Sequence, residues 1–149
     1  MMKILEENLI KMLAFTFGSL VVSKTIISTT NSPEAIGPYS QAVNIKGGLT
    51  FTSGQIPLNK SGVIISNDFE EQVSQVLKNI QGILKERNRD ISDIIKLTVF
   101  IIDLSNFKIL NKIFEDFFKG HDFPSRSVVE VSKLPKNSQV EIEAIFSDD

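Results

Sequence analysis

The final stretch of the chain, residues 140–146, places apolar residues at every second position. Two glutamates, Glu141 and Glu143, lie between them. Because successive side chains of a strand point to opposite faces, this pattern predicts a strand with one apolar and one acidic face. The apolar face carries Val140, Ile142, Ala144 and Phe146. A strand of this kind belongs to a sheet whose second face is solvated or packs on another chain.

Two segments carry apolar residues at helical spacing. The first covers residues 69–84 and follows Asn67, which we expect to be the N-cap of a capping box with Glu70. The second follows Ser105, its expected cap, and ends at Gly120. The predicted inner stripes are Phe69, Val73, Val76, Leu77, Ile80, Ile83 and Leu84 in the first helix, and Phe107, Leu110, Phe114, Phe117 and Phe118 in the second.

Several further segments are rich in β-branched and apolar residues and predict strands. Residues 94–102 are almost wholly apolar, which predicts a central strand that is buried on both faces. The strands expected besides residues 140–146 are residues 25–28, 41–45, 49–53, 94–102 and 125–131, the second and third joined by a Lys46-Gly47-Gly48 turn. This order predicts an α+β fold in which two helices cover one face of a single sheet.

The chain has 149 residues, which fits one domain over residues 24–149. Residues 1–23 read differently and form an N-terminal extension or a leader. Their apolar run, residues 12–22, is shorter than the ~20 residues of a membrane span, so we expect no membrane partner. We expect the protein in the cytoplasm, or in an organelle if residues 1–23 are a leader.

Composition excludes several kinds of chemistry. The chain has no Cys and one His, so thiol nucleophiles, Cys-zinc sites and multi-His metal sites are excluded. We therefore expect no metal and no cofactor. The net charge of −2 gives no electrostatic attraction to nucleic acid. The glycines at residues 47 and 48 do not precede a helix, so they do not predict a phosphate-binding loop.

Arg126 and Glu141 are the best candidates for chemistry. Each lies in a predicted strand whose alternate residues are apolar. The planar guanidinium of Arg pairs with a carboxylate through two hydrogen bonds. A glutamate on a neighbouring strand could hold a water molecule as a general base. Taken alone, Arg and Glu on strand faces are more typical of a surface salt bridge than of a site.

Five short motifs connect these residues to a known family. They are GPYSQAV at residues 37–43, FTSGQIP at 51–57, FPSRSVVEV at 123–131, LPK at 134–136 and EIEA at 141–144. In this order and spacing the chain resembles the RidA family, also called YjgF or L-PSP. The resemblance runs from about residue 25 to residue 146 and leaves out the N-terminal extension.

The resemblance implies a chorismate-mutase-like α+β fold and a homotrimer with clefts between subunits. The implied activity is the hydrolysis of 2-imino and 2-enamino acids, such as 2-iminobutanoate and 2-iminopropanoate, to 2-oxo acids and ammonia. Arg126 would bind the substrate carboxylate, and Glu141 would orient the attacking water. The other implied pocket residues are Tyr39, Ser53, Gly54, Asn111 and the backbone N–H of Val128, where many bacterial members carry Cys.

Two alternatives stay open from the sequence. Some members of the family are described as endoribonucleases or translation inhibitors, but this chain has scattered basic residues and a single His. The second alternative is a non-catalytic trimer that binds 2-oxo acids in the same cleft. Imine hydrolysis by the wild-type chain would distinguish the deaminase function from both alternatives.

Overall fold

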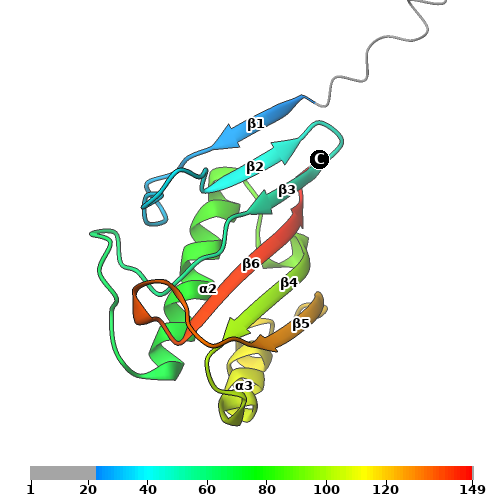
Figure 1. The fold of residues 1–149 in the computed structure, drawn as a ribbon. Coiled ribbons are helices and arrows are strands. Elements are labelled where there is room, and N and C mark those ends of the chain that lie inside the picture. Colours follow the sequence, from blue (N-terminus) through cyan, green and yellow to red (C-terminus); the bar gives the residue numbers. More distant parts are fainter. Residues whose placement is uncertain (1–22, 149) are drawn as a thin grey trace, which may run out of the picture.

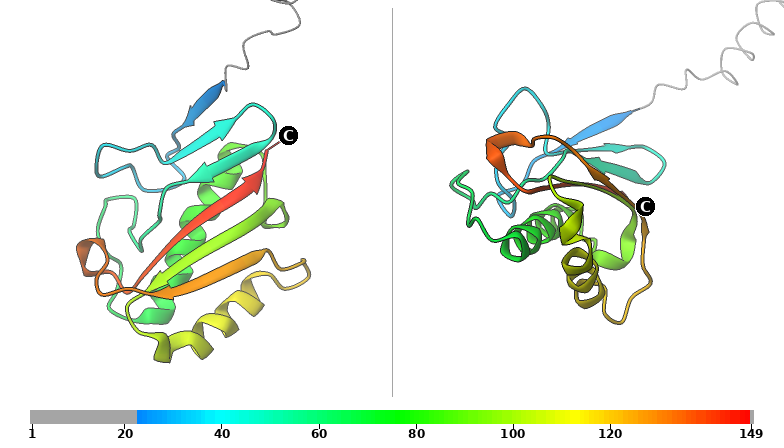
Figure 2. Two further views of the ribbon diagram at one scale, coloured as in Figure 1. Left: turned by 45° about the vertical axis from the view of Figure 1, so that its right-hand side comes forward. Right: turned by 60° about the horizontal axis from the view of Figure 1, so that its bottom comes forward.

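The computed structural model describes residues 23–148, which form one six-stranded sheet with two α-helices on one of its faces (Figures 1 and 2). The order across the sheet is β1-β2-β3-β6-β4-β5. The strands are β1 (Lys24–Ile27), β2 (Ala42–Ile45), β3 (Leu49–Thr52), β4 (Ile94–Ile101), β5 (Ser125–Glu130) and β6 (Val140–Ser147), and the helices are α2 (Phe69–Glu86) and α3 (Phe107–Phe117). This confirms the predicted α+β architecture. The expected extension or leader, residues 1–23, lies outside the described residues apart from Ser23.

The pairing of strands decides which residues can become neighbours. β6 pairs antiparallel with both β3 and β4, whereas β5 pairs parallel with β4 at the edge of the sheet. A parallel neighbour needs a crossover connection, and α3 supplies it between β4 and β5. As a result β4 separates β5 from β6, so the two strands that carry Arg126 and Glu141 are not adjacent.

Helix α2 packs its apolar stripe against the sheet, as predicted. Val73, Val76, Ile80 and Ile83 are fully buried. The helix begins one residue later than expected, because the carboxylate of Asp68 accepts a hydrogen bond of 2.9 Å from the backbone N–H of Glu71. The predicted capping box of Asn67 with Glu70 is therefore wrong.

Helix α3 also differs from its prediction at the N-terminus. A 3₁₀ turn, Leu104–Asn106, precedes it, and the carboxylate of Asp103 accepts a hydrogen bond from the N–H of Ser105. Ser105 is thus inside the turn and does not cap α3. The predicted inner stripe is buried at Leu110, Phe114 and Phe118, but Phe107 is 39% exposed. The prediction that Phe107 belongs to the core is wrong.

The sheet face that points away from the helices is open in the single chain. In β4 the side chains of Leu97, Val99 and Ile101 are buried under the helices. The residues that alternate with them, Lys96, Thr98 and Phe100, point to the other face and are only partly buried. Ile95 is exposed at an irregularity of the strand between Ile94 and Lys96. The prediction of a strand buried on both faces does not hold for this chain alone. Phe51 of β3 is exposed on the same side. In β6 the predicted alternation is confirmed, with Val140, Ile142, Ala144 and Phe146 in the core.

The hairpin between β2 and β3 turns through Gly47 and Gly48, whose φ angles are 121° and 89°. Both lie in the region that only glycine enters readily, which confirms the predicted turn. Within residues 23–148, no helix is both long and apolar enough to cross a membrane.

Candidate active site

Arg126 lies in β5 and points toward the helix layer. Its strand partner in β4 is Leu97, which is a core residue, so the two side chains share the helix-covered face. The Nη2 atom of Arg126 donates a hydrogen bond of 2.7 Å to Oδ1 of Asn111 in α3. Cζ of Arg126 lies 4.8 Å from the ring centroid of Phe114 and 5.7 Å from that of Phe107. The guanidinium is therefore held from one side by α3.

A hollow of about 320 Å³ opens beside this guanidinium. It is lined by Asn111, Phe114, Glu115, Phe123, Pro124 and Arg126. Partial burial lowers the pKa of Arg126. A half-buried cation gains most from a ligand of opposite charge, so the hollow suits a small molecule with a carboxylate.

The backbone of β5 offers a further donor at the edge of the sheet. The N–H of Val131 donates to the carbonyl of Ile101 in β4. Because N–H groups alternate in direction along a strand, the N–H of Val128 points to the other side, the open edge of β5. The Val128 side chain packs against the core. This placement suits the predicted role of the Val128 backbone.

Glu141 lies in β6 and points to the open face of the sheet. Its neighbours Val140 and Ile142 are fully buried on the opposite side. Glu141 itself is half-buried, and burial raises the pKa of its carboxyl, as does the negative charge of Glu143 two residues along the same face. A carboxylate with a raised pKa is better suited to accept a proton from water than an ordinary surface glutamate.

A bulge in β3 brings Gly54 next to Glu141. The regular pairing of β3 with β6 ends at Phe51 opposite Ile145, and pairing resumes at Gln55 opposite Ile142. One extra residue on the β3 side therefore bulges outward. A Cβ atom at Gly54 would overlap the carboxylate of Glu141 and lie 2.7 Å from its Cδ. Only glycine lets the backbone approach this close to the carboxylate.

Ser53 and Tyr39 join the same side of the sheet. The hydroxyl of Ser53 donates a hydrogen bond of 2.6 Å to the carbonyl of Ser40, which ties the bulge to the loop that carries Tyr39. Tyr39 is 46% exposed, and its hydroxyl accepts a 3.2 Å hydrogen bond from the N–H of Ile36. Tyr39 and Gly54 line one small hollow of about 20 Å³. The Ser53 hydroxyl hydrogen is therefore used by the loop, and its oxygen remains free to accept.

The predicted site residues thus form two groups on opposite faces of the sheet. Arg126, Asn111 and Val128 make the first group, beside α3. Glu141, Gly54, Ser53 and Tyr39 make the second, on the open face. The prediction that Arg126 and Glu141 lie on neighbouring strands is wrong, since β4 lies between them and their side chains point apart. One chain cannot bring the two groups together.

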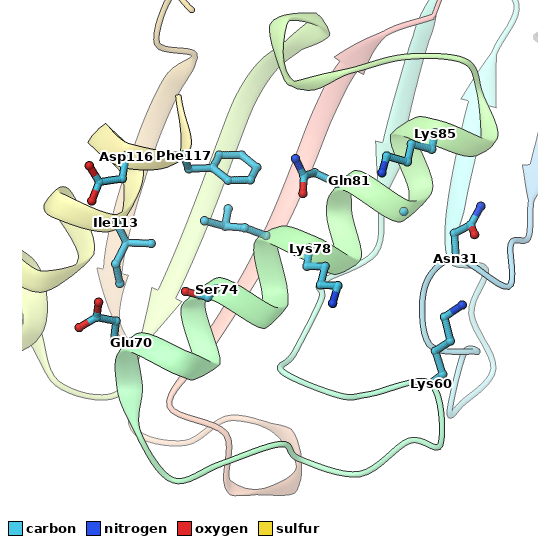
Figure 3. A pocket seen from close by; sticks show the side chains of 12 residues that line it. Asn31, Lys60, Glu70, Ser74, Lys78, Gln81, Lys85, Ile113, Asp116 and Phe117 are labelled. Atoms are coloured by element: carbon cyan, nitrogen blue, oxygen red, sulfur yellow. The ribbon is translucent and has the colours of Figure 1, made fainter. Parts of the chain in front are cut away.

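A wider hollow, of about 660 Å³, lies elsewhere, between α2, α3 and the loops around Asn31 and Lys60 (Figure 3). Its rim carries Lys78, Lys85 and Asp116, with Phe117 at the α3 side. None of the predicted site residues lines it. It is open to solvent, and we do not place the site there. Among residues 23–148, no group of three or more His, Cys, Asp or Glu gathers as a metal site would require.

Phe107 and Phe114 were missed as site residues, since the sequence assigned them to the core. Their spacing carried a signal. Asn111 and Phe114 follow Phe107 by four and by seven residues, so the three side chains share one helix face. The β3 bulge was also missed. In it, Oγ1 of Thr52 accepts a hydrogen bond of 2.9 Å from the N–H of Ala144.

Comparison with known proteins identifies the family. The family model described as Endoribonuclease L-PSP matches residues 29–147. The chain belongs to the L-PSP family. The resemblance read from the five motifs is thereby confirmed.

This L-PSP chain is similar to one relative that is named for its activity and to two solved structures. The chain is 44% identical over 126 residues to the 2-iminobutanoate/2-iminopropanoate deaminase of Salmonella typhimurium. The match covers 83% of this chain and 97% of the relative. A Rid family structure from Yersinia pestis has 48% identity and a TM-score of 0.81, covering 84% of this chain and 99% of that one. The Escherichia coli TdcF structure with bound serine has 42% identity and a TM-score of 0.78, with coverages of 84% and 99%.

Proposed function

We propose that the protein is a cofactor-independent hydrolase that converts reactive 2-imino and 2-enamino acids to 2-oxo acids and ammonia. The observation that carries the proposal is a pair of complementary groups, an arginine that Asn111 holds beside a hollow and a glutamate with a raised pKa. The name of the Salmonella typhimurium relative, a 2-iminobutanoate/2-iminopropanoate deaminase, supports the same reaction.

The complete site forms where two copies of the chain meet. Arg126 and Glu141 face opposite sides of one sheet, so each group needs a partner chain to supply the other. The open sheet face carries exposed apolar side chains, including Phe51 and Val129, which an assembly would cover. A homotrimer with three shared clefts satisfies both requirements. Cyclic assemblies of this kind repeat one heterologous contact around the ring.

The reaction needs one water molecule placed between the two groups. Arg126 holds the carboxylate of the imino acid through paired hydrogen bonds, with the Val128 N–H as a further donor. Glu141 of the adjoining chain takes a proton from water as its oxygen bonds to the C=N carbon. That proton passes to nitrogen and gives a carbinolamine. The hydroxyl proton of the carbinolamine then moves to the amino nitrogen, the C–N bond breaks, and ammonia leaves as the C=O bond forms. Imine and water thus give a 2-oxo acid and ammonia.

Positioning supplies most of the rate in such a reaction. An imine is already electrophilic, and a fixed carboxylate together with an aimed water replaces a bimolecular encounter. A general base in place contributes about 100- to 10,000-fold. The proposed reaction requires Arg126 and Glu141 and uses no metal or organic cofactor.

A competition assay tests the proposal directly. Threonine dehydratase generates 2-iminobutanoate, semicarbazide traps it, and the added protein competes for it. Wild type should reduce trapping, while Arg126→Ala and Glu141→Ala should each lose at least about 100-fold. An assembled wild-type protein without effect on trapping would contradict the proposal. Saturable binding of 2-oxobutanoate without turnover would then favour the non-catalytic reading.

The family description, Endoribonuclease L-PSP, favours an RNA-directed function. Metal-free RNA cleavage uses paired acid and base groups. The single His121 lines a hollow with Gln81 and Leu84 of α2, on the helix side of the sheet, whereas Glu141 points to the open face. Nuclease activity that co-elutes with the assembled protein and disappears in Glu141→Ala would support this second candidate. Activity that separates from the protein on a column would exclude it.

A further inference from the structure

Phe107 is an exposed aromatic residue at the start of α3 that the hydrophobic core does not require. Its side chain is 39% exposed, whereas Leu110 and Phe114 on the same helix are buried. The centroid of its ring lies 5.7 Å from Cζ of Arg126. This is within the ~6 Å range at which an aromatic ring attracts a cation. The position of the ring is therefore explained by Arg126 rather than by packing.

Three residues on one face of α3 hold the same guanidinium. Phe107, Asn111 and Phe114 follow each other at helical spacing. Asn111 accepts a hydrogen bond from Nη2 at 2.7 Å, and the Phe114 ring centroid lies 4.8 Å from Cζ. Two rings and one amide oxygen thus fix both the position and the plane of the guanidinium.

All three contacts come from neutral groups. Among the described residues, the ion pairs within 4.0 Å join Arg87 and Arg89 to Asp148, and none involves Arg126. A ring quadrupole and an amide oxygen attract a cation without neutralising it. Arg126 therefore stays oriented while its charge remains available to an anionic ligand.

We propose that Phe107 is a positioning residue, whose ring holds the Arg126 guanidinium in the orientation that receives the carboxylate of a 2-imino or 2-oxo acid. The identity of that ligand rests on the proposed function. Phe114 makes the closer contact but is also a core residue, so its substitution would confuse orientation with folding. Phe107 can be changed without opening the core.

Two variants separate the ring from its bulk. Phe107→Leu keeps an apolar side chain and removes the ring, whereas Phe107→Tyr keeps the ring. We expect Phe107→Leu to raise KM for 2-iminobutanoate and Kd for 2-oxobutanoate about two- to fivefold, with kcat unchanged, and Phe107→Tyr to match wild type. Ile109→Ala is the matched control, since Ile109 is 42% exposed on the same helix. It should change neither constant.

Each outcome decides one question. Wild-type values in Phe107→Leu, or equal losses in the Leu and Tyr variants, overturn the role of the ring. So does a KM increase that accompanies loss of assembly on a sizing column. If wild type binds 2-oxobutanoate without hydrolysing imines and Phe107→Leu weakens that binding, the deaminase function fails and the role of Phe107 stands. If wild type neither hydrolyses 2-iminobutanoate nor binds 2-oxobutanoate, both fail.

Discussion

At the scale of single residues, the closest approach in the site is between the Gly54 backbone and the Glu141 carboxylate. A Cβ atom at Gly54 would meet the far end of a flexible side chain, so Gly54→Ala should displace the carboxylate rather than unfold the chain. A displacement of about 1 Å costs about 100-fold in rate. We expect kcat to fall by that order, with an unchanged circular dichroism spectrum and unchanged assembly.

The double variant Gly54→Ala/Glu141→Ala is the control for this prediction. If Gly54 acts only through Glu141, the alanine at Gly54 should cause no further loss once Glu141 is removed. Independent, multiplying losses would show that Gly54 serves the site in another way.

The raised pKa of Glu141 predicts a pH dependence. Glu141 accepts a proton in the reaction, so the rate falls as the pH drops through the pKa of its carboxyl, which burial and Glu143 hold above the ordinary value. Glu143→Gln removes the like charge and lowers that pKa. The acid limb of kcat/KM should then move to lower pH. Measurement relative to uncatalysed hydrolysis corrects for the imine itself.

Glu86→Gln is the matched control for Glu143→Gln, because Glu86 is an exposed glutamate at the end of α2. It removes one negative charge without touching the open face of the sheet. An identical shift in both variants would assign the effect to net charge and would contradict the role given to Glu143.

At the residue scale, the motifs and the family resemblance named the residues of the two groups but not Phe107 and Phe114 on α3. They could not reveal which residues face each other. Arg126 and Glu141 lie in strands that follow one another along the chain, and only the crossover through α3 places β4 between them. Phe107 looked like a core residue because its helical spacing is the same in either role.

At the scale of elements, Asp148 joins the end of β6 to the β2–β3 hairpin and to α2. Its side chain is 3% exposed. Oδ2 accepts hydrogen bonds from Asn44 at 2.9 Å, from Thr50 at 2.6 Å and from Nε of Arg87 at 2.7 Å. Burial opposes ionisation of Asp148, but the hydrogen bonds from Arg87 and Thr50 and the charges of Arg87 and Arg89 outweigh it and lower its pKa.

We expect Asp148→Asn to lower the free energy of unfolding by about 1–3 kcal/mol at pH 7, the range for a hydrogen bond to a charged group. A depressed pKa stabilises the fold above the ordinary pKa of Asp, and this contribution is lost as the pH falls through the lowered value. The difference between variant and wild type should therefore shrink in acid. Urea unfolding at several pH values measures it.

Asp122→Asn, at an exposed aspartate after α3, serves as the control for Asp148→Asn. It should leave the unfolding free energy within about 0.5 kcal/mol of wild type. An Asp148→Asn effect that does not vary with pH would contradict the assignment to the charged pair.

Helices and strands were predicted well where the apolar residues follow one clear periodicity, and less well at their ends. Asn67 and Asp68 are both good caps, and the choice of Asp68 depends on where α2 meets the sheet. The open face of β4 could not be predicted from residues 94–102. An apolar residue that a partner chain would cover cannot be distinguished in the sequence from one that is buried within its own chain.

At the scale of the whole molecule, the two groups of the site predict complementation between inactive variants. Arg126→Ala and Glu141→Ala each spoil one half of a shared cleft. When the two variants are mixed equally, unfolded and refolded together, about one quarter of the clefts combine an intact Arg126 with an intact Glu141. We expect about one quarter of wild-type activity to return in the competition assay.

Each variant refolded alone is the control and should stay inactive. A site built within one chain would give no recovery on mixing, because every chain then carries one defect. Recovery without co-refolding would show that chains exchange between assemblies on the timescale of the assay.

The opposite directions of Arg126 and Glu141 have a consequence for when the protein can work. In the proposed assembly, a folded single chain holds only half of each cleft, so it would be inactive until it binds further copies of itself. Turnover per chain should decline on dilution, once the concentration drops below that at which the assembly holds. The rate at which such an enzyme removes reactive imines would therefore rise more steeply than in proportion to the concentration of the chain.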